Sequence, residues 1–251
     1  INNDKPDLMI AAFDTSKKTF RHEKYPDYKA TREKMPDEMI GQLPYLWKIL
    51  ESMGIPTLEK PGFEADDIIG TLASMASKEN LEVYIVSGDK DFMQLVNENI
   101  FLYTPSGRKA DIKIYDRNGV IDKWGVPPEK IIDLLGLMGD ASDNVPGVPG
   151  VGEKTAVKLI KEYGSLEASL DHADEVKNKR AREGLQNARS EALLSKDLVT
   201  IDTNMDLNID FSTLKTNDID KESLALIFQE LEFETLQKQI LGDDIPNSKK
   251  K

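Results

Sequence analysis

The chain contains no cysteine and only two histidines, His22 and His172, among 251 residues. Disulfide bonds and thiolate metal sites are therefore excluded, and structural zinc is not expected. Long apolar runs are also missing, because none approaches the roughly 18 residues that a membrane-spanning helix needs. The opening residues, 1–7, are polar rather than like a signal peptide. We therefore expect a cytoplasmic protein, and its 39% apolar content is enough for one substantial core.

Basic residues are outnumbered, since 33 Lys and Arg against 45 Asp and Glu leave a net charge of −12. A surface that binds nucleic acid has to neutralise phosphates with basic side chains, so the total charge argues against such a partner. Two segments differ from the rest: residues 17–34 hold seven basic residues against three acids, and residues 177–189 hold five against one. Either segment alone is typical of a solvated face, but the two together keep nucleic acid open as a partner.

The apolar runs are short and end in polar residues. Residues 8–13 are followed by Asp14, and residues 81–86 are followed by a Ser-Gly-Asp turn that ends at Asp89. Such runs are typical of buried parallel strands with functional residues at their carboxyl ends. Between them, residues 64–78 place apolar side chains at helical spacing. This alternation predicts an α/β fold with a largely parallel central sheet flanked by helices.

The character of the chain changes near residue 120. Residues 104–110 indicate a loop and 112–115 a short strand, after which most segments are helical. Helix-period apolar residues mark the ranges 128–138, 153–163, 189–196 and 221–240. We therefore expect three parts, namely an α/β core at 1–120, a helical subdomain at 121–241 and a tail or linker at 242–251.

Carboxylates gather at the predicted strand ends and helix starts. They are Asp14, Glu64, Asp66, Asp67, Asp89, Asp91, Asp140 and Asp143. Because Asp14 and Asp89 follow buried strands, we expect their side chains to meet at the same sheet edge. Mutual repulsion would raise the pKa values of so many neighbouring carboxylates, and hard divalent cations relieve it. The set can serve two magnesium ions, which support phosphodiester hydrolysis without cysteine, histidine or a covalent nucleophile.

Each acidic segment also has a simpler explanation. An isolated Glu-Ala-Asp-Asp at 64–67 is most often a charge cluster at a helix N-terminus, where the helix dipole favours it. A lone Gly-Asp-x-Asp at 88–91 is as typical of a turn as of a metal site. The joint arrangement of these segments is what favours metal binding.

A glycine-rich segment at 145–161 leads into a predicted helix. It contains Gly147, Gly150 and Gly152, followed by Lys154 and Thr155. Glycines let a backbone approach a phosphate, and the first amides of a helix can donate to it. The segment therefore predicts sequence-independent contact with a DNA backbone. It is not a Walker loop, because Glu153 separates Gly152 from Lys154. An ordinary connection between two helices is the alternative.

Four longer segments together identify a family. They are FDTSKKTFRHEKYPDYKATR at 13–32, EADDIIGTLA at 64–73, SGDKDFMQLV at 87–96 and KWGVPPEKIIDLLGLMGDASDNVPGVPGVGEKTAVKLI at 123–160. Their order and spacing closely resemble the 5′ nuclease domain of the bacterial DNA polymerase I family, over residues 5–241. The family's N-terminal strand, which carries a further aspartate, is not among these residues. We expect it to precede Ile1 in the whole protein.

The resemblance implies roles for individual residues. The implied metal ligands are Glu64, Asp66, Asp67, Asp89, Asp91, Asp140 and Asp143, with Asp14 as a catalytic acid beside them. Lys29 and Arg32 match the basic residues beneath the family's helical arch, where the scissile phosphate and the 5′ strand pass. Tyr25 and Tyr28 lie beside them, either to stack on bases or to pack. The glycine-rich segment resembles the family's helix-hairpin-helix, which contacts duplex DNA and can hold K⁺, here through Gly147, Gly150, Gly152, Lys154 and Thr155.

The implied activity is that of a structure-specific 5′ nuclease with two Mg²⁺ ions, for which Mn²⁺ can substitute. Its implied substrates are flapped or branched DNA and RNA primers in replication and repair. The implied setting is a monomeric protein of the bacterial cytoplasm with a covalently attached polymerase domain. Two alternatives stay open: a branched-DNA-binding module with an incomplete metal cluster, and a small-molecule phosphohydrolase with a strand-end aspartate nucleophile. The latter would need a second aspartate two residues after Asp14, where the sequence has Ser16.

Overall fold

A computed structural model gives the structure of the chain and describes residues 5–106, 111–211 and 218–242. The chain divides into two compact units. The smaller unit consists of Ile1–Phe13, Glu33–Glu59 and Leu207–Lys251, and the larger unit of Asp14–Arg32 and Lys60–Asp206. The boundary expected near residue 120 stays a prediction. Over the ranges that the structure describes, no helix is both long and apolar enough to cross a membrane.

The smaller unit combines one pair of short strands with helices. Strand β1 (Ala11–Ala12) runs parallel to β2 (Thr57–Leu58), so only part of the strand predicted at 8–13 forms. The helices are α2 (Asp37–Ile40), α3 (Leu43–Ser52), α11 (Lys221–Glu230) and α12 (Glu234–Leu241). Helix α3 packs on α11, whose buried Leu224 and Phe228 form the centre of this core.

The single helix predicted at 221–240 is wrong in one respect. Glu232 has a φ of 56°, in the left-handed region that an α-helix does not tolerate, and it separates α11 from α12. The amide of Phe233 then donates to the carbonyl of Phe228 at 2.8 Å, which closes the turn. The apolar period continues across this break, and for that reason the sequence pattern does not reveal it.

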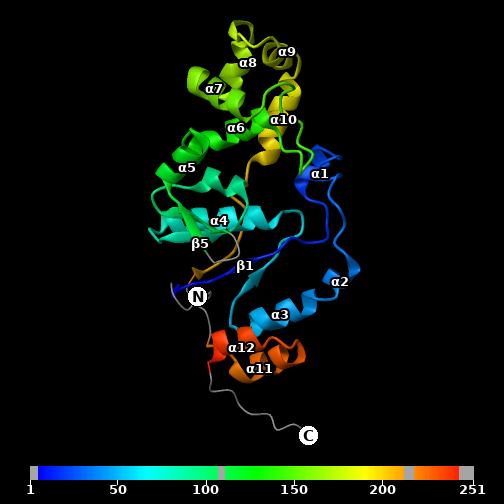
Figure 1. Cartoon of the computed structure of the whole chain (residues 1–251), viewed down its shortest axis with the longest axis vertical. Coiled ribbons are helices and arrows are strands. Elements are labelled where there is room, and N and C mark those ends of the chain that lie inside the picture. Colours follow the sequence, from blue (N-terminus) through cyan, green and yellow to red (C-terminus); the bar gives the residue numbers. More distant parts are fainter. Residues whose placement is uncertain (1–4, 107–110, 212–217, 243–251) are drawn as a thin grey trace. The chain divides into compact units, whose positions relative to one another are not determined.

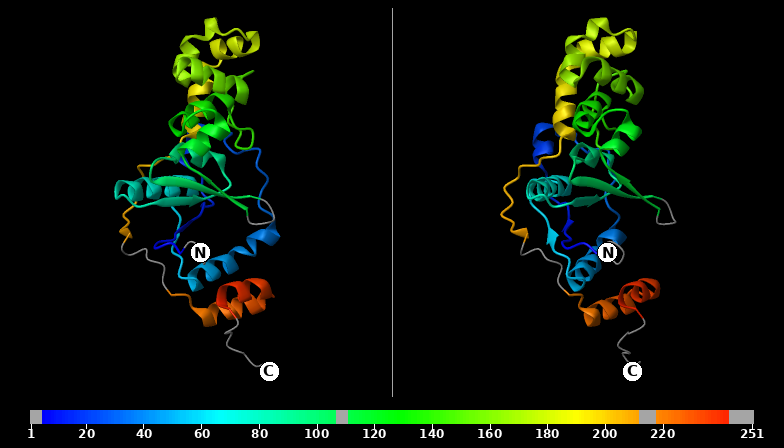
Figure 2. Two further views of the ribbon diagram at one scale, coloured as in Figure 1. Left: turned by 60° about the vertical axis from the view of Figure 1, so that its left-hand side comes forward. Right: turned by 90° about the vertical axis from the view of Figure 1, so that its left-hand side faces the viewer.

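A three-stranded sheet forms the centre of the larger unit. Its order is β3 (Val83–Val86), β4 (Ile100–Ser106), β5 (Asp111–Tyr115). Strand β3 is parallel to β4, and β5 returns antiparallel to β4. Helix α4 (Ala65–Lys78), drawn in cyan, packs against β3 along one face of the sheet (Figure 2). This small sheet, in which β3 and β4 are parallel, is flanked by helices and confirms the predicted α/β class.

Two details of the sheet differ from the prediction. Residues 104–106, predicted as loop, belong to β4, because pairing with β5 extends the ladder to Ser106↔Asp111. The rest of the predicted loop, 107–110, lies outside the described residues. Strands β1 and β3 also belong to different sheets, so Asp14 and Asp89 do not follow neighbouring strands.

The rest of the larger unit is helical (Figure 1). Short α1 (Phe20–Lys24) precedes the sheet, and 3₁₀ helices occur at η1 (Lys90–Leu95), η2 (Pro128–Lys130) and η3 (Ala173–Glu175). The α-helices after the sheet are α5 (Arg117–Trp124), α6 (Ile131–Met138), α7 (Glu153–Tyr163), α8 (Leu166–Asp171), α9 (Lys179–Asn187) and α10 (Arg189–Val199). The helices predicted at 153–163 and 189–196 are thus confirmed.

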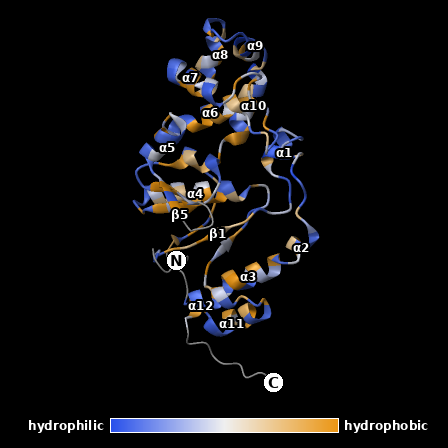
Figure 3. Ribbon diagram, in the orientation of Figure 1, coloured by the Kyte–Doolittle hydropathy of each residue, from blue (hydrophilic) through white to orange (hydrophobic). Residues whose placement is uncertain are grey.

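Helix α6 is the apolar centre of these helices. Its Leu134, Leu135 and Leu137 are fully buried, and it packs against α10, where Leu198 is buried. Hydrophobic colour accordingly gathers on α6, whereas α9 is mostly hydrophilic (Figure 3). Because α6 is buried on most sides, packing fixes the position of its C-terminal end. The loop that begins there carries two of the predicted site acids.

Candidate metal centre

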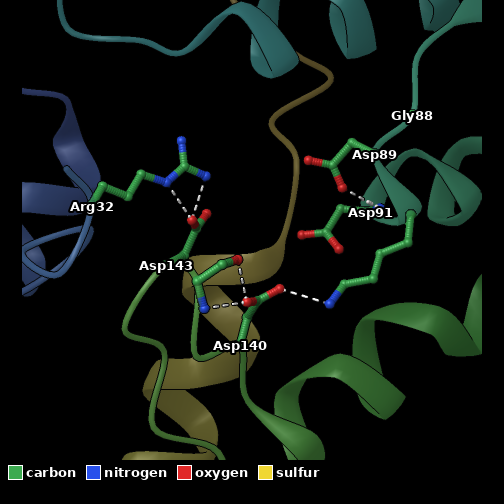
Figure 4. A pocket seen from close by; sticks show the side chains of 8 residues that line it. Arg32, Gly88, Asp89, Asp91, Asp140 and Asp143 are labelled. Carbon is green, nitrogen blue, oxygen red and sulfur yellow. Dashed lines mark hydrogen bonds and ion pairs between the residues drawn. The ribbon is translucent and has the colours of Figure 1, made fainter. Parts of the chain in front are cut away.

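A pocket of about 270 Å³ in the larger unit collects four of the predicted acids (Figure 4). We name it the acid pocket. It is lined by Arg32, Gly88, Asp89, Lys90, Asp91, Asp140, Ser142 and Asp143. These residues come from three places: the segment after α1, the junction of β3 and η1, and the loop after α6. The structure therefore brings together two pairs of acids that lie about fifty positions apart in the chain.

Local backbone geometry places Asp89 and Asp91. Asp89 follows β3 and is the N-cap of η1, where its side chain accepts a hydrogen bond from the amide of Asp91 at 2.9 Å. Aspartate is a preferred N-cap because its carboxylate satisfies a free helix amide. The cap turns the chain so that both side chains face the pocket (Figure 4).

A closed loop places Asp140 and Asp143. The amide of Asp140 donates to the carbonyl of Val145 at 3.0 Å, and the amide of Val145 donates back at 2.7 Å. Gly139 and Gly147 lie where the two ends of the loop meet, each with positive φ. A Cβ atom on Gly139 would come within 2.5 Å of the carbonyl oxygen of Val145. A side chain at Gly139 would thus force the loop open, which explains this glycine by packing.

The side chain of Asp91 has an unused acceptor. Its Oδ1 is buried and has no hydrogen-bond partner among the described residues. Burial, and next the charge of Asp89, raises the pKa of Asp91 to about 7. A buried carboxylate oxygen without a partner is costly unless a proton or a cation reaches it. Hard divalent ions take such oxygens as ligands, so the acid pocket fits a divalent metal ion by the chemistry of its donors.

A second group of acids lies at the start of α4. Glu64 is the N-cap of this helix and is buried, and the amide of Ala65 donates to Asp14 Oδ1 at 2.7 Å. Burial, and then the charges of Asp89 and Glu64, raises the pKa of Asp66 to about 7, with a smaller effect of Asp14. Asp14, Asp66 and Asp89 are therefore electrostatic neighbours, although their strands belong to different sheets.

Asp67 differs from the acids around it. It is fully buried, and Arg21 donates to both of its oxygens, at 2.7 Å and 2.8 Å. The amides of Glu64 and Asp202 donate to it as well, at 3.1 Å and 2.9 Å. Its lone pairs are thus taken by the protein. Like Glu64 and Asp66, Asp67 does not line the acid pocket.

Two basic residues of the 17–34 segment contact the predicted site acids directly. Lys29 Nζ lies 2.7 Å from Glu64 Oε1 and 3.9 Å from Asp143 Oδ2. Arg32 Nε donates to Asp143 Oδ1 at 2.8 Å, and its Nη2 contacts the same oxygen. Across the described part of the chain, no three Asp, Glu or His side chains are grouped so that they could hold one ion together. Basic side chains are interleaved with the acids instead.

The two tyrosines of this segment are partly or wholly enclosed. Tyr28 is 4% exposed, and its hydroxyl donates to Glu64 at 3.2 Å and contacts Asp143 at 3.4 Å. Burial, and then the charges of Glu64 and Asp143, raises the pKa of Tyr28 well above its usual value. Tyr25 is half-buried and packs on the same core. The geometry of Tyr28 favours packing over base stacking.

The glycine-rich segment joins α6 to α7. Gly147 and Gly150 have positive φ, and a Cβ on Gly150 would lie 2.6 Å from Arg180 Cγ, so both glycines are explained by close packing. Gly152 is different, because it is exposed, is the N-cap of α7 and has open space around its Cα. Lys154 beside it is exposed, and Thr155 is half-buried in the first turn of α7.

Sequence patterns missed three residues of this region. Lys90 contacts Asp140, Ser142 donates two hydrogen bonds to Asp140, and Arg21 neutralises Asp67. Lys90 and Ser142 each lie between two predicted ligands in the sequence, and Arg21 lies in the basic 17–34 segment. These positions are the only signals that point to the three residues, and none of them specifies a partner.

Fold and pocket together define a class of protein: an α/β core whose acids converge beside basic side chains, extended by a helical region. Residues 1–125 match the family model of the 5′-3′ exonuclease N-terminal resolvase-like domain, and residues 126–222 match that of the 5′-3′ exonuclease C-terminal SAM fold. The chain therefore belongs to the 5′-3′ exonuclease family.

The sequence relatives are longer proteins. DNA polymerase I of Bacillus subtilis (strain 168) is 43% identical over 244 residues, which cover 97% of this chain and 28% of that protein. The thermostable DNA polymerase I of Thermus filiformis is 40% identical over 240 residues, which cover 95% of this chain and 28% of that protein. The chain thus spans little more than a quarter of the length of these relatives.

Solved structures share the fold. T5 5′-exonuclease with bound divalent metal ions (zinc) has a TM-score of 0.67 at 22% identity, covering 93% of this chain and 83% of that one. The catalytic core of Rad2 in complex with DNA substrate has a TM-score of 0.58 at 18% identity, covering 92% and 76%.

Proposed function

We propose that this chain is a structure-specific 5′ nuclease that hydrolyses phosphodiester bonds in flapped or branched DNA and in RNA primers, with divalent ions at the acid pocket. The observation that carries the proposal is the buried Oδ1 of Asp91, which has no partner among the described residues, in a pocket with three further carboxylates. Family membership and the DNA polymerase I relatives support it. A polymerase domain in the same protein follows from those relatives as part of the proposal.

The proposed ligands form two groups. Asp89, Asp91, Asp140 and Asp143 line the acid pocket, and Glu64, Asp66 and Asp14 lie at the start of α4. Two Mg²⁺ ions, when bound, supply Lewis acidity and a water of lowered pKa for attack on phosphorus. Asp67 stays outside this set in the proposal, because Arg21 already occupies both of its oxygens.

Lys29 and Arg32 are proposed to hold the scissile phosphate. Both reach acids of the site, Glu64 and Asp143, so both stand at its edge. Arg32 is half exposed and presents a planar guanidinium that matches phosphate oxygens. Fixed positive charge at this place stabilises the negative charge that develops on the phosphoryl oxygens during hydrolysis.

Duplex DNA is proposed to bind at the start of α7. The exposed Gly152 leaves room for a phosphate close to the backbone, and Lys154 adds a charge that contacts phosphates regardless of base sequence. The carbonyl groups of the same turn are the proposed ligands of a K⁺ ion. Gly147 and Gly150 are proposed to shape this turn by allowing its close packing on the protein.

Cleavage of a 5′-labelled flap duplex tests the proposal. We expect cutting near the junction with Mg²⁺, none with EDTA, and none with Asp89→Asn. The matched control is Asp171→Asn, which changes an exposed aspartate on α8 that pairs with Arg189. If the wild type binds the junction tightly but does not cut in any divalent ion, the chain is a branched-DNA-binding module instead.

A further inference from the structure

Lys90 lies in the wall of the acid pocket but contacts an acid far away in the sequence. Its Nζ is 2.8 Å from Asp140 Oδ2, and the two side chains are 36% and 12% exposed. The preceding and following residues, Asp89 and Asp91, also line this pocket. The ammonium group is therefore surrounded by carboxylates, one of which it contacts directly.

The contact with Lys90 completes the hydrogen bonding of Asp140. Asp140 Oδ1 accepts from the amide of Ser142 at 2.8 Å and from its hydroxyl at 2.6 Å. Oδ2 is taken by Lys90. Asp91 shows the opposite condition, since its buried Oδ1 has no partner among the described residues. Two acids that line one pocket thus differ in whether the protein itself already supplies a cation.

We propose that Lys90 is a positioning residue whose ammonium group contacts Asp140 Oδ2 while no metal ion is bound. When a divalent ion binds, it displaces the ammonium group from this oxygen. The inference rests on the proposed function. An ammonium group and a metal ion cannot both contact the same carboxylate lone pair, so the ion pair of Lys90 with Asp140 reduces the affinity for the ion. Until the exchange, the same contact ties η1 to the loop after α6.

This role predicts opposite effects on stability and on ion affinity. Without Lys90, Asp140 faces Asp89 and Asp91 with no positive charge between them, which destabilises the ion-free protein. The divalent ion then has no competitor and binds more tightly. A residue that only supports the fold would lower both quantities together, so the combination of signs identifies the exchange.

The test compares Lys90→Met and Lys90→Gln with Lys24→Met. Calorimetry measures the binding of Mn²⁺ to each protein in the absence of DNA. Lys24 pairs with Asp197 at 2.7 Å on the surface of the larger unit, so its loss removes the same charge without touching the acid pocket. We expect both Lys90 variants to bind Mn²⁺ about threefold to tenfold more tightly and to unfold at a lower temperature without ions. Lys24→Met should match the wild type in both measurements.

Repeating the Mn²⁺ titration at about 1 M salt separates the direct contact of Lys90 with Asp140 from the long-range electrostatic effect of removing a positive charge. At this salt concentration the screening length is about 3 Å. We expect the tighter binding of the Lys90 variants to persist, since the contact itself is 2.8 Å long. Unchanged or weaker Mn²⁺ binding in both variants would overturn the inference. So would Lys90→Gln behaving as the wild type, because Gln keeps a donor without the charge.

Failure of the proposed function looks different. In that case the wild type itself binds no divalent ion at the acid pocket, and Asp89→Asn leaves its calorimetric trace unchanged. Wild-type binding that Asp89→Asn abolishes, together with Lys90 variants of unaltered affinity, would refute the role of Lys90 alone. If Lys90→Met does not fold, the same comparison is made with Lys90→Gln.

Discussion

Two carboxylates of the larger unit show two ways of burying a negative charge. Asp67, in the first turn of α4, accepts from both guanidinium arms of Arg21 and from two backbone amides. Asp91, in η1, keeps a buried oxygen without a partner among the described residues. The first arrangement stabilises the fold, whereas the second keeps an acceptor ready for a ligand. Adjacency to other acids in the sequence does not distinguish them.

The Arg21 pair also joins distant segments. Arg21 Nε donates to the carbonyl of Leu198 at 2.8 Å, and its Nη2 to that of Thr200 at 2.7 Å. Asp67 accepts from the amide of Asp202. One buried pair therefore connects α1, the start of α4 and the segment after α10. Because Glu64 caps the same helix, this network also fixes the position of a proposed metal ligand.

The largest expected effect comes from breaking this pair. Arg21→Ala leaves the buried carboxylate of Asp67 without its cationic partner, which should lower the free energy of unfolding by about 3–5 kcal/mol. Urea denaturation of the ion-free protein measures it. The control is Lys24→Ala, whose exposed ion pair with Asp197 should be worth no more than about 1 kcal/mol. Equal losses in the two variants would contradict the structural role of Arg21.

Removing the charge of Asp91 should have a large effect on activity instead. Asp91→Asn keeps the shape of the side chain but weakens a proposed ligand, and we expect flap cleavage to fall by at least about 10²-fold. Its unfolding curve should not shift to lower urea, because the variant removes a repulsive charge beside Asp89. Cleavage at the wild-type rate would show that Asp91 takes no part in the reaction.

A smaller effect is expected from pH. The pKa of Asp91 rises from 3.8 to about 7 in the folded protein, so the folded state binds this proton more tightly than the unfolded state does. Its contribution to stability is therefore present below about pH 4 and lost as the pH rises toward 7. The difference between the wild type and Asp91→Asn in ion-free buffer isolates this contribution. A difference that does not change between pH 4 and pH 7 would contradict the raised pKa.

The smallest expected effect concerns duplex binding. Lys154→Ala should weaken binding to duplexes of any sequence and reduce the slope of affinity against salt by about one. Fluorescence anisotropy at several salt concentrations measures both. Lys24→Ala serves again as the control, with an unchanged slope. A loss confined to particular DNA sequences would refute a backbone contact at Lys154.

Elements with a clear period could be predicted from the sequence. Helix 64–78 is present as α4, with Glu64 as its cap, and helix 153–163 is present as α7. Four of the predicted acids do share one pocket, but not for the reason that the sequence suggested, because Asp14 and Asp89 do not follow neighbouring strands of one sheet. The sheet was less predictable: β1 and β3 lie in different sheets, since pairing depends on partners that a strand's own residues do not specify.

The sequence does not predict which acids pair with basic side chains of the protein and which are left as proposed metal ligands. Asp66 and Asp67 are neighbours in the sequence, yet successive residues of a helix point in directions about 100° apart. One therefore lies among the charges of Asp89 and Glu64, and the other meets Arg21. Arg21, the partner of Asp67, lies 46 positions away in the sequence. Asp140, the partner of Lys90, also lies far from it in the sequence, so no local pattern indicates either pair. Only the folded chain assigns these pairs.

Divalent-ion binding to Asp91→Asn and Asp67→Asn, measured by calorimetry beside urea denaturation of the ion-free proteins, tests the central comparison most directly. We predict that Asp91→Asn loses affinity for Mg²⁺ and Mn²⁺ without losing stability, and that Asp67→Asn loses stability while its folded fraction binds ions as the wild type does. The reverse result, with ion affinity lost in Asp67→Asn and stability lost in Asp91→Asn, would contradict the assignment of the two carboxylates.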